Sequence, residues 1–498
     1  MSALSIAQNL PADILFIILK DAVQSTIPDE RSLATLSLSH VCSSFRRAAL
    51  RCPTLWTCLS RRLGRPGLAL IEACMERSQD QPLDVTFSFY PISPQDEPLP
   101  HRLRQETMVV DNIVQAVLSS SIRWRSCSIR LTSDDSRDRL SSTTFDLDSF
   151  ASTIYIPTPM LKDFSIEEDA SLAERFPFNT RGRTMIKNFR PGAHWSLPNL
   201  RNVTLRNTLA NTIPWPSLSR IQSLRWALTD DELGLVNHIF YMRYLASATS
   251  LTHLHLSLID CRVLSTSALP VVELPSVKTV HVEVLGSSLA SSNVAAMWHA
   301  LSKIHLPNAL ELNLFFDLGK ENKGIPLVVW NEYIAGYDSS LAVSGPQSPF
   351  PSLETLSISL WVDAGSKFVD PPTILVPHYC IPSSLKHLRV KSSFDVTLND
   401  TNANARTTPG LFLNTSLQTI TFDLPSVRGV AQWMRGLARK MMDRRIWSAF
   451  SELKLVRGGE LEVIPRDRVL QWCDVVEEPG SRPPSATKQF LSDKATTP

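Results

Sequence analysis

Apolar residues recur along most of the chain in one short phrase: an apolar residue, two others, a second apolar residue, one other and a third apolar residue. The alternation within this phrase is typical of a strand with one buried face. The phrase occurs ten times after residue 80, at Leu161/Phe164/Ile166, Leu200/Val203/Leu205, Ile221/Leu224/Trp226, Leu251/Leu254/Leu256, Val277/Val280/Val282, Ala309/Leu312/Leu314, Leu353/Leu356/Ile358, Leu385/Leu388/Val390, Leu417/Ile420/Phe422 and Phe450/Leu453/Leu455. The sequence therefore predicts a series of short, half-buried strands.

Successive phrases are separated by about 30 residues, which is enough for a strand, a loop, a helix and a return. Helices are expected between phrases and ahead of the first one, at residues 68–77, 108–119, 231–246 and 291–303. We interpret the longer interruptions at residues 318–349 and 391–412 as loops. This spacing is that of leucine-rich repeats, so we expect an irregular leucine-rich-repeat-like α/β solenoid over residues 61–475.

A doubly wound α/β domain also alternates strands and helices. We favour the solenoid because the strands are short and amphipathic, whereas strands covered on both faces are continuously apolar. The polar, proline-bearing residues 476–498 are expected to form a disordered tail.

Residues 10–60 follow a different pattern. After Leu10-Pro11, apolar residues at helical spacing predict a first helix, and Pro11 suits its first turn. Two more short helices are predicted, carrying Leu33, Leu36 and Leu38, and then Val41, Cys42, Phe45, Ala48 and Ala49, before Cys52-Pro53. Three short helices bury little apolar surface by themselves, so we expect them to bind a partner or to cap the following domain.

The strings LPADILFIIL and LATLSLSHVCSSFRRAALRCPTLW within residues 10–56 resemble an F-box. The resemblance rests on Leu-Pro, an acid two residues later, paired aliphatics, a Val-Cys-x-x-aromatic-Arg helix and the closing Pro-x-Leu-Trp. Residues 1–60 are therefore expected to be an F-box, and the following segments resemble the region behind the F-box of fungal F-box proteins.

This resemblance implies a substrate-recognition subunit of an SCF-type cullin–RING ubiquitin ligase, without catalytic residues or a cofactor of its own. Its partners would be a Skp-type adaptor, the cullin scaffold and a protein target whose identity the sequence does not give. The residues that would face the adaptor are Leu10, Pro11, Ile14, Leu15, Val41, Cys42, Phe45 and Arg46. The alternative is a repeat scaffold that binds a partner without any ligase.

The target is expected on the open face of the strands. If the first, fourth and sixth residues of each phrase face the core, the third, fifth and seventh face the opposite side of the sheet. The expected target-binding residues are His253, His255, His281, Glu283, His387, Arg389 and Lys391. Positive charge gathers at Arg389 and Lys391, which would suit an acidic or phosphorylated segment.

Composition narrows the function further. The chain has 498 residues, of which 43% are hydrophobic and 20% charged, so it can build a folded core. A net charge of +2 gives no electrostatic argument for a nucleic acid or a membrane as partner. Eight scattered cysteines without a Cys-x-x-Cys pair, and no signal peptide or spanning segment, indicate the cytoplasm, the nucleus or both.

Catalytic and metal-binding motifs find little support. The sequence has no Gly-x-Ser-x-Gly, no phosphate-binding loop and no His-Glu-x-x-His. His253-x-His255 places two imidazoles on one face of a strand but has no third ligand nearby in sequence, so we expect no metal site. The apolar stripe Val430, Trp433, Met434, Leu437 and Met441 lies among arginines and lysines. We expect it to pack inward, rather than to bind a membrane or a calmodulin-type partner.

Overall fold

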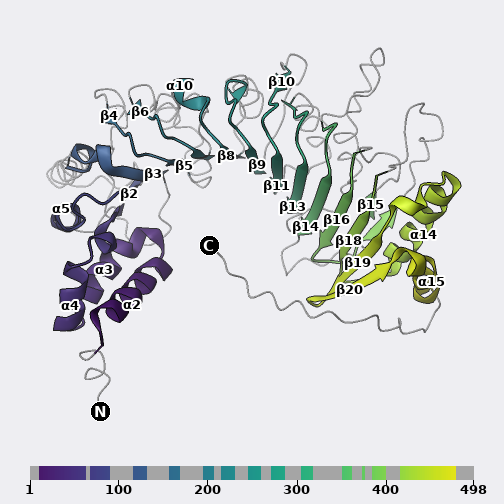
Figure 1. Cartoon of the computed structure of the whole chain (residues 1–498), viewed down its shortest axis with the longest axis horizontal. Coiled ribbons are helices and arrows are strands. Elements are labelled where there is room, and N and C mark those ends of the chain that lie inside the picture. Colours follow the sequence, from purple (N-terminus) through teal and green to yellow (C-terminus); the bar gives the residue numbers. More distant parts are fainter. Residues whose placement is uncertain are drawn as a thin grey trace, which may run out of the picture. The chain divides into compact units, whose positions relative to one another are not determined.

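The computed structural model describes residues 10–62, 68–89, 116–131, 156–168, 195–206, 215–229, 245–259, 271–285, 304–317, 350–361, 373–375, 384–399 and 416–477. Its secondary structure is mixed α/β and includes a large, mostly parallel sheet (Figure 1). The chain divides into two compact units, residues 1–224 and residues 225–498. The boundary falls within strand β8 (Ser223–Thr229).

The N-terminal unit begins with short helices. They are α2 (Ala12–Ser25), α3 (Arg31–Ser39) and α4 (Ser43–Leu50), with 3-10 turns at Pro28–Glu30 and Pro53–Trp56. Helix α2 starts directly after Pro11, whose extended backbone precedes the first turn. The buried indole of Trp56 donates a 2.8 Å hydrogen bond to the Ala49 carbonyl, which fixes the turn after α4.

The interior of these helices is only partly apolar. Helix α2 buries Leu15, Leu19 and Val23, whereas α3 buries the polar side chains Ser32, Thr35 and Ser39. The leucines that mark this helix in the sequence, Leu33, Leu36 and Leu38, are only half-buried. Small side chains allow α3 to approach its neighbours closely, and their hydroxyls find partners. Thr35 donates a 2.9 Å hydrogen bond to the Leu55 carbonyl.

Five parallel strands follow in the described part of this unit. They are β1 (Cys58–Arg62), β2 (Leu83–Phe89), β3 (Trp124–Leu131), β5 (Asp163–Glu168) and β7 (Asn202–Arg206), each paired with the one before it. Helix α5 (Leu68–Arg77) connects β1 and β2 and confirms the helix predicted there. Short strands β4 (Ile156–Pro157) and β6 (Trp195–Ser196) pair separately, and α10 (Trp215–Leu218) precedes β8.

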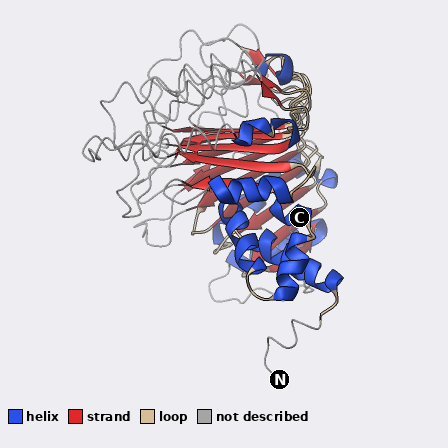
Figure 2. Ribbon diagram, turned by 90° about the vertical axis from the view of Figure 1, so that its left-hand side faces the viewer, coloured by secondary structure: helices blue, strands red, loops and turns tan. Residues whose placement is uncertain are grey.

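The C-terminal unit also consists mainly of parallel strands (Figure 1). Figure 2 draws the described strands in red and the described helices in blue. The main strands of this unit are β9 (His253–Ile259), β11 (Thr279–Leu285), β13 (Glu311–Asp317), β14 (Thr355–Trp361), β16 (His387–Ser392), β18 (Thr419–Asp423), β19 (Glu452–Arg457) and β20 (Glu460–Pro465). All pair in parallel in chain order except β19 and β20, which form an antiparallel hairpin. Gly458 and Gly459 form its turn at φ values of 54° and 87°, a conformation that suits glycine.

The strand phrases predict these strands and their buried faces correctly. Every apolar position of the ten phrases is buried, with at most 3% of the residue exposed. Register is kept from strand to strand, so that Leu254, Val280, Leu312 and Leu356 lie side by side on the inner face. Within each unit the described strands run in chain order, without the reversal that a doubly wound sheet requires.

Some expected connections differ from the structure. The predicted loop at residues 391–412 begins with the end of β16 and contains β17 (Thr397–Asn399), which pairs with β15 (Thr373–Leu375). A further two-stranded sheet joins β10 (Val272–Glu273) and β12 (Ile304–His305). The helices predicted at 231–246 and 291–303 and the loop predicted at 318–349 lie almost entirely outside the described residues, as do most of 108–119 and 476–498.

Helix α14 (Arg428–Asp443) carries the basic, amphipathic sequence. Its stripe of Val430, Trp433, Met434, Leu437 and Met441 is buried, with at most 2% exposed, so the prediction that it packs inward is confirmed. Helix α15 (Arg466–Glu477) lies against α14, and Arg435 pairs with Asp474 across them at 2.8 Å.

Candidate functional site

Two regions of the described residues are candidates for a functional surface, and the first is the exposed side of α2. Ile14, Ile17 and Ile18 recur at helical spacing and are 40%, 57% and 41% exposed. They lie apart from the buried stripe of Leu15, Leu19 and Val23, so α2 has apolar side chains on two sides. Isoleucines exposed at this spacing are typical of a helix that contacts another protein.

The expected adaptor-facing residues divide between surface and interior. Pro11, Ile14, Val41 and Arg46 are exposed, whereas Leu10, Cys42 and Phe45 are half-buried. Leu15 is 3% exposed and packs inside the helices, so we remove it from the expected adaptor surface. Ile17 and Ile18 share the apolar helical spacing of Ile14 but were not among the expected adaptor-facing residues, and the structure shows that both are exposed.

The second region is the open face of the strands in the C-terminal unit. Register aligns the fifth residues of successive phrases into one row: His255, His281, Asn313, Ser357, Arg389 and Thr421. The third and seventh residues form neighbouring rows. These side chains are exposed or half-buried as predicted, apart from Ser257, which is 2% exposed.

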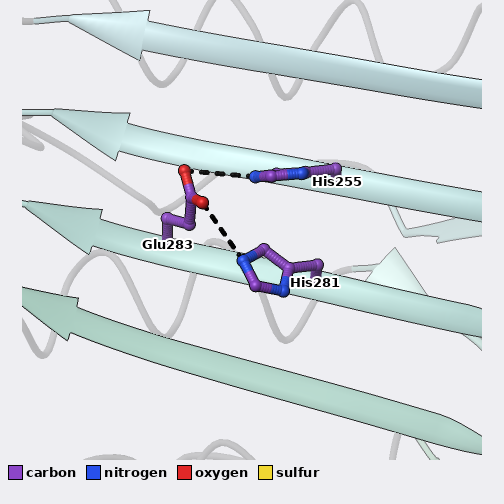
Figure 3. A group of neighbouring side chains, drawn as sticks. All are labelled: His255, His281 and Glu283. Carbon is purple, nitrogen blue, oxygen red and sulfur yellow. Dashed lines mark hydrogen bonds and ion pairs between the residues drawn. The ribbon is translucent and has the colours of Figure 1, made fainter. Parts of the chain in front are cut away.

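Three expected target-binding residues gather at one point of this face (Figure 3). His255 and His281 are register partners on β9 and β11, with ring centroids 4.3 Å apart. Glu283 lies two residues beyond His281, and its carboxylate accepts from both rings. The Nε2 of His255 is 3.1 Å from Glu283 Oε2, and the Nε2 of His281 is 3.2 Å from Oε1.

Ser257 on β9 also contacts this cluster. It is the register partner of Glu283, and its hydroxyl donates to Glu283 Oε2 while lying 3.1 Å from the His255 Nε2. Hydrogen bonds from His255 and His281 hold the pKa of the Glu283 carboxyl well below its usual range, although partial burial opposes the shift. The Glu283 carboxylate is therefore negatively charged although its side chain is half-buried.

His253 does not join the cluster. It lies two residues before His255 on the same strand, but its ring contacts the Thr252 hydroxyl at 2.8 Å. The pair that forms is thus His255 with His281, across two strands, and not His253 with His255 within one strand. Alignment of the two phrases by position indicates this pairing, because both histidines occupy the fifth place.

The basic residues on β16 lie elsewhere on the same face. Arg389 is exposed, Lys391 pairs with Asp423 on β18 at 3.2 Å, and His387 contacts the Thr419 hydroxyl at 2.8 Å. Asp423 offsets the lysine charge, so Arg389 is the stronger candidate for contact with an anion.

The chain matches no protein-family model and no curated protein. None of the helices in the described part of the chain combines the length and the apolar character needed to span a membrane.

Proposed function

We propose that the chain is a substrate-recognition subunit of an SCF-type ubiquitin ligase. In this role the N-terminal helices would be an F-box that binds a Skp-type adaptor. The strands behind them would be a leucine-rich-repeat-like solenoid that binds the target. The chain would perform no bond chemistry itself but would raise the concentration of target lysines near the ligase's catalytic subunits.

The observation that carries the proposal is the exposed apolar surface of α2. It occurs within the segment whose sequence resembles an F-box, and its isoleucines would be buried by an adaptor. Removing three aliphatic side chains from water favours association, since burial of one isoleucine contributes about 1.5–3 kcal/mol before the costs of binding.

The open face of the strands supports the second half of the proposal. Apolar residues hold each strand in register, and the polar residues between them do not contribute to that core. Such a face can vary its side chains without disturbing the fold, which suits recognition of a protein partner.

Co-purification with the adaptor tests the ligase assignment. We expect the full chain to bind a Skp-type adaptor in a pull-down with purified components. Ile14→Asp should weaken that binding by about 2–4 kcal/mol, because a charge replaces an apolar contact in the proposed surface. The matched control is Val271→Asp, since Val271 is an exposed aliphatic residue ahead of β10. This control should bind the adaptor normally.

Both variants should retain the circular dichroism of the parent chain, because both side chains are exposed. Failure of the parent chain to bind any adaptor would refute the ligase assignment and favour the repeat scaffold that works without a ligase. An equal loss of adaptor binding in Ile14→Asp and Val271→Asp would show that α2 is not the adaptor-binding surface.

Target recognition is tested separately through Arg389. Arg389→Glu should leave adaptor binding intact and deplete acidic partners from the proteins that co-purify with the chain, because the guanidinium would pair with their carboxylates or phosphates. Lys162→Glu is the matched control, since Lys162 is an exposed cation just ahead of β5. An unchanged set of partners for Arg389→Glu would exclude β16 as the docking point.

A further inference from the structure

The cluster of His255, His281 and Glu283 has the composition of a metal site. Two imidazoles and one carboxylate are a ligand set that zinc sites use, with a fourth position left for water or another ligand. The three ligand atoms lie within 4.8 Å of one another. They come from two neighbouring strands that hydrogen-bond along their length, so the backbone fixes their positions.

The distances suit a small cation. Zinc binds nitrogen and oxygen ligands at about 2.0–2.1 Å, so tetrahedral ligands lie about 3.4 Å from one another. The two His–Glu separations, 3.1 and 3.2 Å, are close to this value. Because each ring faces a different oxygen of Glu283, a cation bound by both rings and one oxygen requires rotation of the side chains, while the strands keep their register. Imidazole ligands favour a transition metal, whereas calcium and magnesium prefer oxygen ligands.

The surroundings provide the support that metal ligands require. Metal-binding carboxylates are oriented by a hydrogen bond from a neighbouring group. Here the Ser257 hydroxyl donates to Glu283 Oε2, and Ser257 is 2% exposed. The ligand residues are themselves partly exposed, with side-chain exposures of 25% for His255, 33% for His281 and 21% for Glu283. A cation could thus enter from the open side of the sheet.

We infer that His255, His281 and Glu283 bind a divalent transition metal ion such as Zn²⁺ on the open face of β9 and β11. The Nε2 atom of each imidazole and one oxygen of the carboxylate supply three ligands, and Ser257 orients the carboxylate. Binding replaces the two His–Glu hydrogen bonds, and each ring binds as a neutral imidazole whose single proton lies on Nδ1, so that the Nε2 lone pair faces the metal. This inference is independent of the ligase assignment.

Zinc binding to the full chain tests the inference. The protein is stripped with a chelator, exchanged into clean buffer and titrated with ZnCl₂ against a chromophoric chelator. We expect the parent chain to bind one more equivalent than His281→Gln and His255→Gln, or to hold that equivalent at least tenfold more tightly. His253→Gln is the matched control, because His253 lies on the same strand and the same face but outside the cluster. It should bind zinc like the parent chain.

Equal binding by the parent chain and both ligand variants would overturn the inference, and so would a loss in His253→Gln as large as that in His255→Gln. Circular dichroism checks that the variants are folded. If they are not, Co²⁺ added to the parent chain gives the answer. The expected result is the visible absorption of four-coordinate Co²⁺, which zinc should abolish. A spectrum of hydrated Co²⁺ only would leave the cluster as an ion-paired group without a metal.

Discussion

The N-terminal helices and the strands of the C-terminal unit distribute apolar and polar residues in opposite ways. Helix α3 buries serine and threonine, while α2 exposes isoleucines. Each strand buries every apolar position of its phrase, and most side chains on the open face are polar. Under the proposed function, this difference would suit two kinds of partner: an apolar one that covers the helices, and a polar one that the strand face selects by charge and hydrogen bonding.

The strongest test of this comparison replaces the same residue type in both regions. Ile358 on β14 is 1% exposed, whereas Ile17 on α2 is 57% exposed. Ile358→Ala should lower the free energy of unfolding by about 2–5 kcal/mol, because it opens a cavity in the sheet's core. Ile17→Ala should change it by less than about 0.5 kcal/mol. Denaturant unfolding followed by circular dichroism measures both, and similar losses would mean that Ile17 is a core residue.

A smaller effect is expected from the polar interior of α3. Thr35→Val keeps the shape of the side chain but removes the donor to the Leu55 carbonyl. The unsatisfied carbonyl should cost about 1–3 kcal/mol of stability, measured as a shift of the denaturation midpoint. Ser37→Ala, at an exposed position of the same helix, serves as control and should have almost no effect. An unchanged denaturation midpoint in Thr35→Val would show that the buried hydroxyl of Thr35 is not needed for stability.

The reactivity of the cysteine thiols gives a further test, because it depends on how deeply each cysteine is buried. Cys42, just before α4, and Cys52, just before the turn Pro53–Trp56, are half-buried, whereas Cys127 on β3 and Cys74 on α5 are buried. Burial raises the pKa of the Cys74 thiol to about 12 and raises that of Cys127 as well. Since the thiolate is the reactive form, iodoacetamide should label Cys42 and Cys52 in the folded protein. Mass spectrometry should find Cys74 and Cys127 labelled only after unfolding.

The same shift predicts a pH dependence. A pKa raised on folding means that the stabilising contribution is complete below the ordinary thiol value of 9.0 and is lost as the pH rises toward 12. Cys74→Ala should therefore lose less stability than the parent chain between about pH 9 and pH 11. Identical alkaline unfolding curves would show that the Cys74 thiol ionises freely in the folded state.

Sequence reasoning was most successful where one physical rule governs many residues. The apolar phrase predicted the strands because burial of one face dictates a period of two, and each phrase aligns with the next. The interior of α3 could not be predicted in this way. Leu33, Leu36 and Leu38 satisfy the helical pattern, but close packing against the turn before β1 selects Ser32, Thr35 and Ser39 instead.

The sequence predicted the face on which the histidine cluster lies but not which residues form it. His255, His281 and Glu283 were each placed correctly on the open face, but a ligand search along a single strand paired His255 with His253. The contact that forms spans 26 residues of chain and depends on the register of β9 with β11. Registers between parallel strands are set by burial of the inner face. The contact partner of His255 is therefore His281, at the same position of the next phrase, and not His253 on its own strand.

The glycine turn between β19 and β20 affects how the protein behaves at high concentration. A series of parallel strands ends in an edge whose free backbone groups could pair with another copy and grow into fibres. The hairpin reverses the direction of the final described strand, and that strand carries Glu460, Glu462 and Pro465. Charge and a missing N–H make this edge a poor template for further strands, so we expect the hairpin to protect the protein against aggregation.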